Sequence, residues 1–579
     1  MGKLKIFSKL LTRIRGLVLF FLFISFLLIS RLYLLQIVRG EDYEEEADQQ
    51  HFATKDIFDR GNIFFEDKNG GKVLAGAIKS GFNLVINPSL LENPQEAYRR
   101  LSGLGLKIDE ETFLTKAGKE GDPHEEIANQ IETVMTNKIE DLNIKGVSLE
   151  KTRWRFYPGG NLASHVLGFV GYAGDSLEGI YGIEKYYNYI LQRSEKDLNK
   201  NFFADIFSNL SEIILGDKNE REGDIVLTIE PSVQSNLEIE LKEISKKWET
   251  DLAGGIIINP QNGEIYAMAL NPDFDLNNFR QAEGVFFGNP LVEGVYEMGS
   301  IIKAITMSIG LDLEVISAKT VYEDTGSLIL DGSKISNYDG RARGVVNMQE
   351  ILNQSLNVGA AFVEKQIGNE KFAQYLSDLG LGEETGIDLP NETYGFLKEL
   401  IKSPRDIEYA TASFGQGIAL TPIGTVKALS ALANGGFLIT PHLVKEIDYS
   451  LGTSDKIVHE NGRRIFKEET SREITRMLKE VVDVALLGGA VKSKDYTIAA
   501  KTGTAQMVKE DGKGYDEDRY LHSFFGYFPT VHPQFLIFLY VLNPKDVEYA
   551  SHTLTEPFIN MFKFLVNYYE VEPDRVSIE

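Results

Sequence analysis

The feature that most limits what this chain can fold into is the order of three short polar motifs between residues 300 and 504. They are Ser300-Ile-Ile-Lys303, Ser355-Leu-Asn357 and Lys501-Thr-Gly-Thr504. Each motif stands on a different predicted element of secondary structure. A nucleophilic hydroxyl, a base, a proton relay and a cationic anchor act together only when the fold brings them into one cleft. The motifs therefore predict one domain that encloses all three.

The first motif is predicted to begin a helix. Gly299 supplies a turn, the apolar-rich residues 301–311 form the helix, and side chains three residues apart share a helix face. Lys303 Nζ then reaches Ser300 Oγ, and it can act as a base if burial or a neighbouring cation lowers the lysine pKa. The helix start also directs N–H groups towards an oxyanion. The motif alone is weak evidence, because a second one occurs at Ser148-Leu-Glu-Lys151.

The second motif is suited to relaying a proton. Ser355 and Asn357 are two residues apart, so an extended or turn backbone points both side chains the same way. Ser355 can pass a proton to a leaving amine, and Asn357 can hold Lys303 or hydrogen-bond a peptide. An ordinary turn or helix cap explains the same tripeptide, since both residue types favour such positions.

The third motif follows the apolar residues 497–500, so Lys501 is expected at the end of a strand or within it. Gly503 lets a substrate backbone approach closely. Lys501 and the hydroxyls of Thr502 and Thr504 make a site for a carboxylate, and the Thr504 N–H can complete an oxyanion hole. A plain strand-to-turn junction is the alternative. The conjunction of the three motifs in this order favours acyl transfer through a covalent acyl-serine.

The elements around the motifs predict an α+β domain built on an antiparallel sheet. Two strands precede the motifs, a largely helical middle follows, and three strands and a helix end the pattern. The predicted strands are 225–229, 256–259, 264–269, 496–500, 523–528 and 535–542, and the predicted helices are 232–248 and 557–569.

The region before residue 235 is mixed in character. Residues 155–171 predict a packed loop that leads into a strand, with His165 as a structural histidine. The charged stretch 217–224 marks a domain boundary. Shorter patterns predict a helix at 41–50, a strand at 82–86 and a surface loop at 116–126.

Composition excludes several classes of function. The 579 residues are too many for one core, and about 150 residues per domain suggests three or four domains. A net charge of −25 disfavours nucleic acid as a partner. The absence of cysteine excludes disulfides, a thiol nucleophile and cysteine-ligated zinc, and the eight histidines form no HExxH-like pair. Neither a metal site nor a cofactor is predicted.

The N-terminal stretch predicts a membrane anchor. Residues 16–30 carry no charge, and the apolar character resumes after Arg31, so that 16–38 reaches the roughly 20 residues that a spanning helix needs. Basic residues precede this stretch and acidic residues follow it, which places 1–15 in the cytoplasm and the rest outside. A cleaved signal peptide is the alternative, but no small-x-small cleavage site follows.

The motifs and their surroundings resemble those of penicillin-binding proteins and serine β-lactamases. Tyr296-Glu-Met-Gly-Ser-Ile-Ile-Lys303 is similar to the family's Tyr-Glu-Pro-Gly-Ser-x-x-Lys, although Met298 replaces the proline and implies a less rigid turn. Residues 254–278, 414–422 and 501–506 resemble other parts of the transpeptidase domain. Arg60-Gly-Asn-Ile63, residues 155–171 and Tyr181-Gly-Ile-Glu184 resemble the pedestal domain of class B enzymes.

The resemblance implies an α+β fold of two folded parts and an anchor. A penicillin-binding/β-lactamase-like domain, with an antiparallel sheet flanked by helices, would stand on an elongated mixed α+β pedestal. The implied division is a cytoplasmic tail at 1–15, a transmembrane helix at 16–38, a pedestal at 39–230 and a transpeptidase domain at 231–579. No glycosyltransferase signature precedes the pedestal, which argues against a bifunctional class A protein.

The resemblance also implies a D,D-transpeptidase that cross-links peptidoglycan stem peptides and is acylated by β-lactams. Ser300 would attack the D-Ala–D-Ala bond while Lys303 accepts its proton, and Ser355 would protonate the leaving D-Ala. Asn357, Lys501, Thr502, Gly503 and Thr504 would complete the catalytic and substrate-binding set. The implied partners are lipid-linked precursors, the bacterial inner membrane and a polytopic glycosyltransferase.

Other functions remain open at this point. A β-lactamase or D,D-carboxypeptidase on the same fold passes the acyl group to water, and neither needs a pedestal and an anchor. A penicillin-binding sensor or scaffold is the non-enzymatic alternative, but no motif residue is lost here. The sequence around Ser355 and Phe414 is closer to the septal, FtsI-like branch than to the elongation branch.

Overall fold

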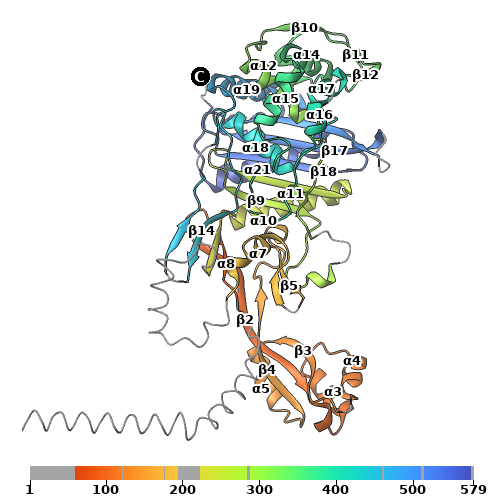
Figure 1. Ribbon diagram of the computed structural model, residues 1–579, viewed down its shortest axis with the longest axis vertical. Coiled ribbons are helices and arrows are strands. Elements are labelled where there is room, and N and C mark those ends of the chain that lie inside the picture. Colours follow the sequence, from red (N-terminus) through yellow and green to blue (C-terminus); the bar gives the residue numbers. More distant parts are fainter. Residues whose placement is uncertain are drawn as a thin grey trace, which may run out of the picture. The chain divides into compact units, whose positions relative to one another are not determined.

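The computed structural model describes residues 59–575, apart from gaps at 120, 175, 194–221, 283–286, 403–404, 451, 460–461 and 510–513. These residues form two compact units (Figure 1), a smaller one of Ser80–Arg153 and a larger one of 59–79 with 154–575. The chain passes between the units along β2 (Lys72–Ile86) and β4 (Val147–Phe156). No helix in the described ranges has the length and apolar character of a membrane span.

Three N-terminal predictions lie outside the described residues. They are the helix at 41–50, the tail at 1–15 and the anchor at 16–38. Most of the boundary predicted at 217–224 also falls in a gap. The division into a pedestal at 39–230 and a second domain at 231–579 stays a prediction.

The larger unit is built on a five-stranded antiparallel sheet of order β16-β17-β18-β8-β9. β18 pairs with β8 from Leu536 opposite Ile258 to Leu542 opposite Leu252. This pairing joins strands from before and after the helical middle, as the sequence predicted. The strands are β8 (Leu252–Ile258), β9 (Ile265–Asn271), β16 (Ala499–Val508), β17 (Tyr515–Phe528) and β18 (Phe535–Leu542).

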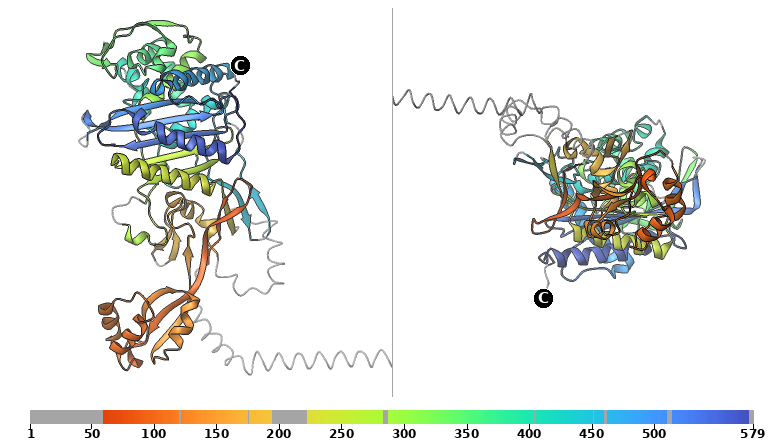
Figure 2. Two further views of the ribbon diagram at one scale, coloured as in Figure 1. Left: turned by 180° about the vertical axis from the view of Figure 1, so that it is seen from behind. Right: turned by 90° about the horizontal axis from the view of Figure 1, so that it is seen from below.

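Two long helices cover one face of this sheet (Figure 2). They are α10 (Pro231–Trp248) and α21 (Thr555–Tyr568). The predicted apolar stripe of α10, made of Val233, Leu237, Leu241 and Ile244, is at most 2% exposed. Its period of three to four residues places one face of the helix on the strands.

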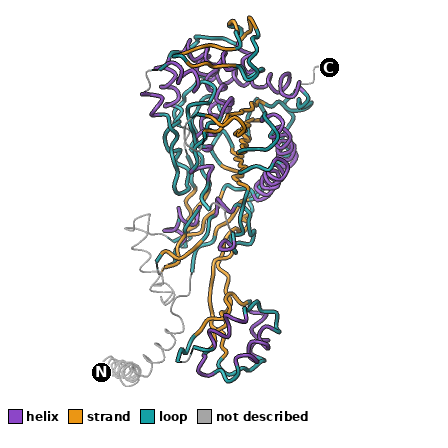
Figure 3. The backbone as a smooth tube through the Cα atoms, turned by 90° about the vertical axis from the view of Figure 1, so that its right-hand side faces the viewer, coloured by secondary structure: helices purple, strands orange, loops and turns teal. Residues whose placement is uncertain are grey.

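The helical middle packs on the other face, where Figure 3 shows helices on both sides of the strands. Its central helix α12 (Ile302–Asp312) is buried on nearly all sides, because sheet and helices surround it. The other helices here are α11 (Pro290–Glu293), α13 (Met348–Asn353), α14 (Asn357–Ile367), α15 (Asn369–Asp378), α16 (Lys398–Lys402), α17 (Asp406–Ala412), α18 (Pro422–Ala433) and α19 (Glu468–Glu480).

Short strand pairs complete the larger unit. A second sheet joins distant segments, because β1 pairs in parallel with β7 (Ile63 opposite Ile225) and β14 pairs with β7. Two ribbons, β10 with β13 and β11 with β12, cap the helical middle. The strands are β1 (Ile63–Glu66), β7 (Gly223–Leu227), β14 (Val444–Tyr449), β15 (Ser454–Lys456), β10 (Val321–Asp324), β11 (Ser327–Leu330), β12 (Ser333–Ser336) and β13 (Gly344–Asn347).

The predicted packed loop at 155–171 turns through a short helix, α6 (Ser164–Leu167), and enters β5 (Val170–Ala173) as expected. His165 is buried, and its ring meets the edge of Phe274 at 5.1 Å between centroids. This environment fits the structural role predicted for the histidine. β6 (Ser176–Gly179), α7 (Gly182–Tyr186) and α8 (Asn188–Leu191) follow.

The segments that resemble a pedestal meet in one buried ionic cluster around Glu184. Arg60 Nε and Arg155 Nε each donate to a different oxygen of this carboxylate at 2.5 Å, and Tyr157 donates its hydroxyl at 3.1 Å. Arg155 also donates to the carbonyl of Gly61 at 2.8 Å. Burial raises the pKa of Glu184, but the two guanidinium groups outweigh it and the net pKa is lowered. The charged carboxylate thus fastens three chain segments together.

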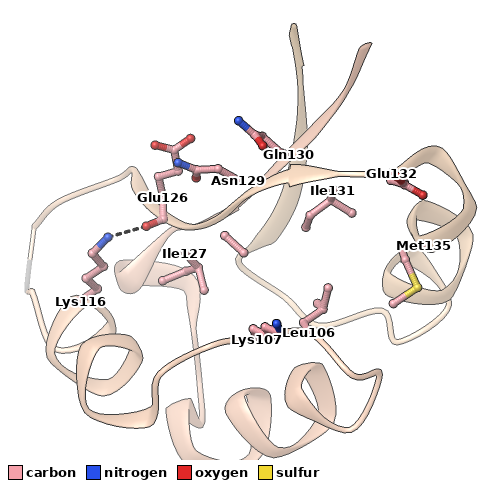
Figure 4. A pocket seen from close by; sticks show the side chains of 11 residues that line it. Leu106, Lys107, Lys116, Glu126, Ile127, Asn129, Gln130, Ile131, Glu132 and Met135 are labelled. Atoms are coloured by element: carbon pink, nitrogen blue, oxygen red, sulfur yellow. Dashed lines mark hydrogen bonds between the residues drawn. The ribbon is translucent and has the colours of Figure 1, made fainter. Parts of the chain in front are cut away.

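The smaller unit has its own core, and the predicted strand at 82–86, which is the end of β2, contributes to it. Leu84, Leu101 and Phe113 are almost wholly buried in it. A hollow of about 580 Å³ lies beside β3, and Lys116 at its edge donates to the carbonyl of Glu126 at 2.6 Å. Figure 4 shows the side chains that line it. The elements are α3 (Pro94–Ser102), α4 (Glu110–Ala117), β3 (Glu125–Ile131) and α5 (Thr133–Glu140).

Replacing Glu184 with alanine should destabilise the larger unit by about 3–5 kcal/mol, because it leaves two buried arginines without their shared carboxylate. Urea unfolding followed by the fluorescence of Trp154 and Trp248 measures this change, since both tryptophans lie in that unit.

The matched control is Glu556→Ala, which removes an exposed ion pair with Lys247 at 3.0 Å. It should cost less than about 1 kcal/mol. Equal costs for the two variants would contradict the role given to the cluster. Because the pKa of Glu184 is lowered by folding, its contribution is present above the ordinary value of 4.5 and is lost as the pH falls through the folded-state pKa.

Candidate active site

The candidate nucleophile lies where a 3-10 turn (Gly299–Ile301) leads into α12. Lys303, on the first turn of that helix, places Nζ 2.9 Å from Ser300 Oγ. Lys303 is 1% exposed, whereas Ser300 is partly open to solvent. An amine shielded from water therefore contacts a hydroxyl that a ligand can reach, as the spacing predicted.

Lys303 is held from the opposite side by the second motif. Its Nζ donates to Asn357 Oδ1 at 2.7 Å, to the carbonyl of Ser355 at 2.7 Å and to Ser355 Oγ at 3.1 Å. Asn357 in turn donates through Nδ2 to the carbonyl of Ser336 at 2.9 Å. That bond fixes the orientation of the amide, so its oxygen faces the lysine.

The backbone of Ser355 explains how one residue supplies two of these contacts. Ser355 lies in the turn between α13 and α14 with φ at +54°, in the left-handed region that non-glycine residues rarely adopt. This conformation turns its carbonyl and its hydroxyl towards the same amine. Strain of roughly 1–3 kcal/mol at such a position is typical of a functional site. The predicted turn at the second motif is confirmed.

The third motif brings a second buried lysine to the same hydroxyl. Lys501, on β16, donates to Ser355 Oγ at 3.2 Å and to the carbonyl of Thr502 at 2.9 Å, and it is 3% exposed. Ser355 Oγ thus lies between two lysines. Ser300, Lys303, Ser355 and Lys501 form one continuous chain of polar contacts.

The electrostatics of the two lysines differ. Burial lowers the pKa of Lys303 well below its ordinary value, and the positive charge of Lys501 lowers it further. Burial lowers the pKa of Lys501 to about 8. The arrangement favours a neutral amine at Lys303 next to a cation at Lys501, which is the pairing that a base and an anion anchor require.

Close backbone packing fixes the turn that carries Ser300. Gly299 has φ at +63°, and a Cβ there would lie 2.7 Å from the carbonyl oxygen of Thr504. A Cβ on Gly503 would lie 2.7 Å from the Met298 carbonyl oxygen, to which Ser523 Oγ donates at 2.7 Å. The turn and β16 are therefore in direct contact. Burial and this hydrogen bond hold the turn at Met298, where the family has proline.

The remaining predicted residues lie along an edge of the sheet. β16 is the end strand, so alternate residues of the motif direct their backbone N–H and C=O groups away from β17, towards the outer side of the sheet. Thr504 Oγ1 accepts a hydrogen bond from the backbone N–H of Ala550 at 3.1 Å. All eight predicted site residues are brought to one place.

The competing motif at Ser148–Lys151 has no such setting. Both residues are exposed on β4, and residues three apart on a strand point to opposite faces. The secondary structure therefore distinguishes the two copies of the motif, because only the helical copy at Ser300 brings its serine and lysine together.

The loop that follows α17 packs against Lys303 and the turn that carries Ser300. The sequence interpretation gave this loop no role. The Phe414 ring centroid lies 5.9 Å from Lys303 Nζ, and a Cβ on Gly415 would lie 2.2 Å from the Gly299 carbonyl oxygen. Glu297 belongs to the motif at 296–303 but was given no role, and Tyr515 on β17 donates its hydroxyl to both of its carboxylate oxygens at 3.0 and 3.1 Å. The glycines in the run 414–417, within the segment 414–422 that resembles the family, were the sequence signal for the contact between Gly415 and Gly299.

Two family definitions match the chain. "Penicillin binding protein transpeptidase domain" matches residues 253–562, and "Penicillin-binding Protein dimerisation domain" matches residues 58–205. The first covers all three motifs. The second covers all three segments of the Glu184 cluster.

Curated relatives match over nearly the whole chain. Stage V sporulation protein D of Bacillus subtilis is 33% identical, over 97% of this chain and 86% of the relative. Peptidoglycan D,D-transpeptidase FtsI of Buchnera aphidicola subsp. Schizaphis graminum is 25% identical, over 96% of this chain and 95% of the relative.

Solved structures share the fold. Penicillin Binding Protein 2X from Streptococcus thermophilus has a TM-score of 0.70 at 20% identity, over 89% of this chain and 81% of that one. Penicillin binding protein 3 from Mycobacterium tuberculosis, complexed with aztreonam, has a TM-score of 0.67 at 20% identity, over 90% and 98%. At these identities the structures establish the fold alone.

Gly415→Ala should displace the Ser300 turn, because the added Cβ would overlap the Gly299 carbonyl. Overpacking of this kind costs about 1–3 kcal/mol. The control is Gly332→Ala, whose φ of +78° matches the +81° of Gly415 but whose Cβ meets nothing within 4 Å. The midpoint temperature of thermal unfolding should fall further in Gly415→Ala than in the control. Equal drops would mean that backbone conformation alone, and not the contact, matters at Gly415.

Proposed function

This chain belongs to the class B penicillin-binding proteins, and we propose from that premise that its serine-type peptidoglycan D,D-transpeptidase activity runs through an acyl-enzyme on Ser300. The observation that carries the proposal is the buried amine of Lys303, which lies 2.9 Å from the partly exposed hydroxyl of Ser300. Penicillin binding, cell division or sporulation, and peptidoglycan synthesis are the activities of this family.

Lys303 is the base. A neutral amine has two N–H groups and one lone pair, and the two shortest contacts, to the Ser355 carbonyl and Asn357 Oδ1, take both N–H groups. The lone pair is left for Ser300, whose hydroxyl donates to it as the oxygen attacks. Burial and the charge of Lys501 both lower the pKa of Lys303, so the amine is ready to accept a proton.

Ser355 relays the proton to the leaving group. As Ser300 Oγ bonds to the carbonyl carbon of the donor stem peptide, the C–N bond to the terminal D-Ala breaks. The proton held by Lys303 passes through Ser355 Oγ, 3.1 Å away, to the departing amine. An amine of a second stem peptide then attacks the acyl ester, which returns the proton to Ser300 and forms the cross-link.

β16 holds the donor. Lys501 and the hydroxyls of Thr502 and Thr504 bind the terminal carboxylate, and Lys501 suits an anion because its pKa of about 8 leaves it charged at neutral pH. Gly503 admits the donor backbone to the edge of the strand. The N–H groups of Ser300 and Thr504 stabilise the oxyanion.

The setting of the enzyme follows from the same family. We infer a single N-terminal anchor at 16–38 in the bacterial inner membrane, with residues 1–15 in the cytoplasm, the pedestal at 39–230 and the transpeptidase domain at 231–579 outside. Its partners are lipid-linked precursors and a polytopic glycosyltransferase. The charge pattern around residues 16–38 and the similarity to FtsI support this arrangement and a septal role.

Labelling of the full chain in detergent by a fluorescent penicillin tests the proposal. Wild-type protein should carry a stable label on Ser300, and Ser300→Ala should carry none, because the proposal assigns the attack to Ser300 and leaves Ser355, the other hydroxyl in contact with Lys303, as the proton relay. Ser148→Ala, in the exposed copy of the motif, is the control and should label like the wild type.

Other labelling results would each indicate a different function for this protein. Label that forms and is quickly lost would indicate a hydrolase of the β-lactamase or carboxypeptidase kind. Absence of label on folded wild type would leave a scaffold on this fold and reject the acyl-serine.

The pH dependence of acylation should report both lysines. The rate constant should rise as Lys303 loses its proton, and it should fall near pH 8 as Lys501 loses its charge. Lys501→Met removes one cause of the lowered Lys303 pKa, so that pKa should rise. The acidic limb of the pH profile, where the rate constant increases as Lys303 loses its proton, should then move to higher pH. Lys501→Arg keeps the charge and should leave that limb in place. An acidic limb that does not move in Lys501→Met would show that the two amines are uncoupled.

A further inference from the structure

Two tyrosines from opposite walls of the active site touch each other. The ring centroids of Tyr338 and Tyr549 are 5.8 Å apart, with their planes at 79°. Tyr338 follows β12 on the helical side, and Tyr549 precedes α20 (Ala550–Thr553) on the sheet side. Edge-to-face contacts of this kind are attractive, so the two walls are joined by side chains alone at this point.

The backbone before Tyr338 is bonded to the helix that carries Asn357. Ser336 accepts from Asn357 Nδ2 at 2.9 Å, and Asn337 Oδ1 accepts from the N–H of Val358 at 3.1 Å. Asn337 is 3% exposed, so this attachment is buried. The ring of Tyr338 itself is 55% exposed. A backbone fixed to the start of α14 therefore presents a half-exposed ring.

Arg343 ties the same segment to the turn that carries Ser355. It donates to Asp339 at 2.8 and 2.9 Å and to Gln354, the residue before Ser355, at 2.9 Å. Its guanidinium carbon lies 5.9 Å from the centroid of the Tyr338 ring. The position of Tyr338 is thus set by the same turn that supplies the proton relay.

Tyr549 is fixed in a corresponding way beside Thr504. The next residue, Ala550, donates its N–H to Thr504 Oγ1 at 3.1 Å. His522, directly opposite Thr504 in the sheet, contacts the Glu548 carbonyl at 3.0 Å and Thr553 Oγ1 at 2.9 Å. The segment that carries Tyr549 is therefore bonded to β16 through Ala550 and to β17 through Glu548, the residues on either side of the tyrosine.

We propose that Tyr338 and Tyr549 form an aromatic gate over the part of the cleft between Asn357 and Thr504, which makes them specificity-determining residues for the acyl donor. Hydrogen bonds hold the segment of each tyrosine to its own side of the site, and the two rings meet through an edge-to-face contact, so the rings can turn apart without moving the catalytic groups. The gate is closed in the free enzyme and opens for an extended peptide, or for the acylamino side chain of a penicillin. This inference rests on the acyl-serine function proposed above.

The second-order rate constant of acylation tests the gate, measured on the full chain with benzylpenicillin and with a bulkier ureidopenicillin. Tyr338→Ala and Tyr549→Ala should each raise it about two- to tenfold, the range that corresponds to loss of one aromatic pair. The increase should be larger for the bulkier drug. The double variant should be no faster than the faster single variant, because losing either ring opens the gate.

Tyr172→Ala, at a 66% exposed ring on β5, is the control and should leave the rate constant unchanged, with all variants unfolding at the wild-type temperature. Slower or unchanged acylation in the single variants would overturn the gate, and so would effects that multiply in the double variant. Those results leave the acyl-serine intact as long as the wild type is labelled and Ser300→Ala is not. A folded wild type without label would overturn both proposals.

Discussion

The structure depends on the burial of one amine. Lys303 is almost fully enclosed, and a charged lysine without a compensating carboxylate is costly to bury. The fold meets this constraint with oxygens from Ser300, Ser355 and Asn357 and with a cation, Lys501, nearby. Each neighbour arrives on a different element, so α12, the α13–α14 turn and β16 must all be correctly placed before the amine is satisfied. Assembly of the helical layer on the sheet and assembly of the chemistry are thus the same event.

Much of this was readable in the sequence, because it rests on local patterns. The stripe at Val233, Leu237 and Leu241 predicted α10, and the apolar runs predicted all five strands of the central sheet, although β16 and β17 extend well beyond the predicted 496–500 and 523–528. The eight site residues were found through three motifs whose spacing follows from helix and strand geometry. Burial then decided which copy of the first motif is placed for chemistry, since Ser148 and Lys151 are exposed on β4.

The rest depended on contacts between distant segments, which no local pattern encodes. The left-handed backbone of Ser355 is imposed by what surrounds it and not by serine itself. The approach of Gly415 to Gly299, and the meeting of Arg60, Arg155 and Glu184, become visible only when the chain is folded. The passage of β2 and β4 between the two units likewise has no signature in periodicity, because a long strand looks the same whichever core it joins.

The glycines around the nucleophile also bear on how β-lactam resistance can evolve. At Gly299, Gly415 and Gly503 a single added carbon would meet backbone atoms at 2.2 to 2.7 Å. Substitutions on the floor of the cleft therefore damage the native reaction together with drug binding, and selection removes them. Exposed positions such as Tyr338, which is 55% exposed, are expected to tolerate change without disturbing Lys303. Variants that exclude a drug but still accept a stem peptide are accordingly expected to accumulate on the rim of the cleft and to spare its floor.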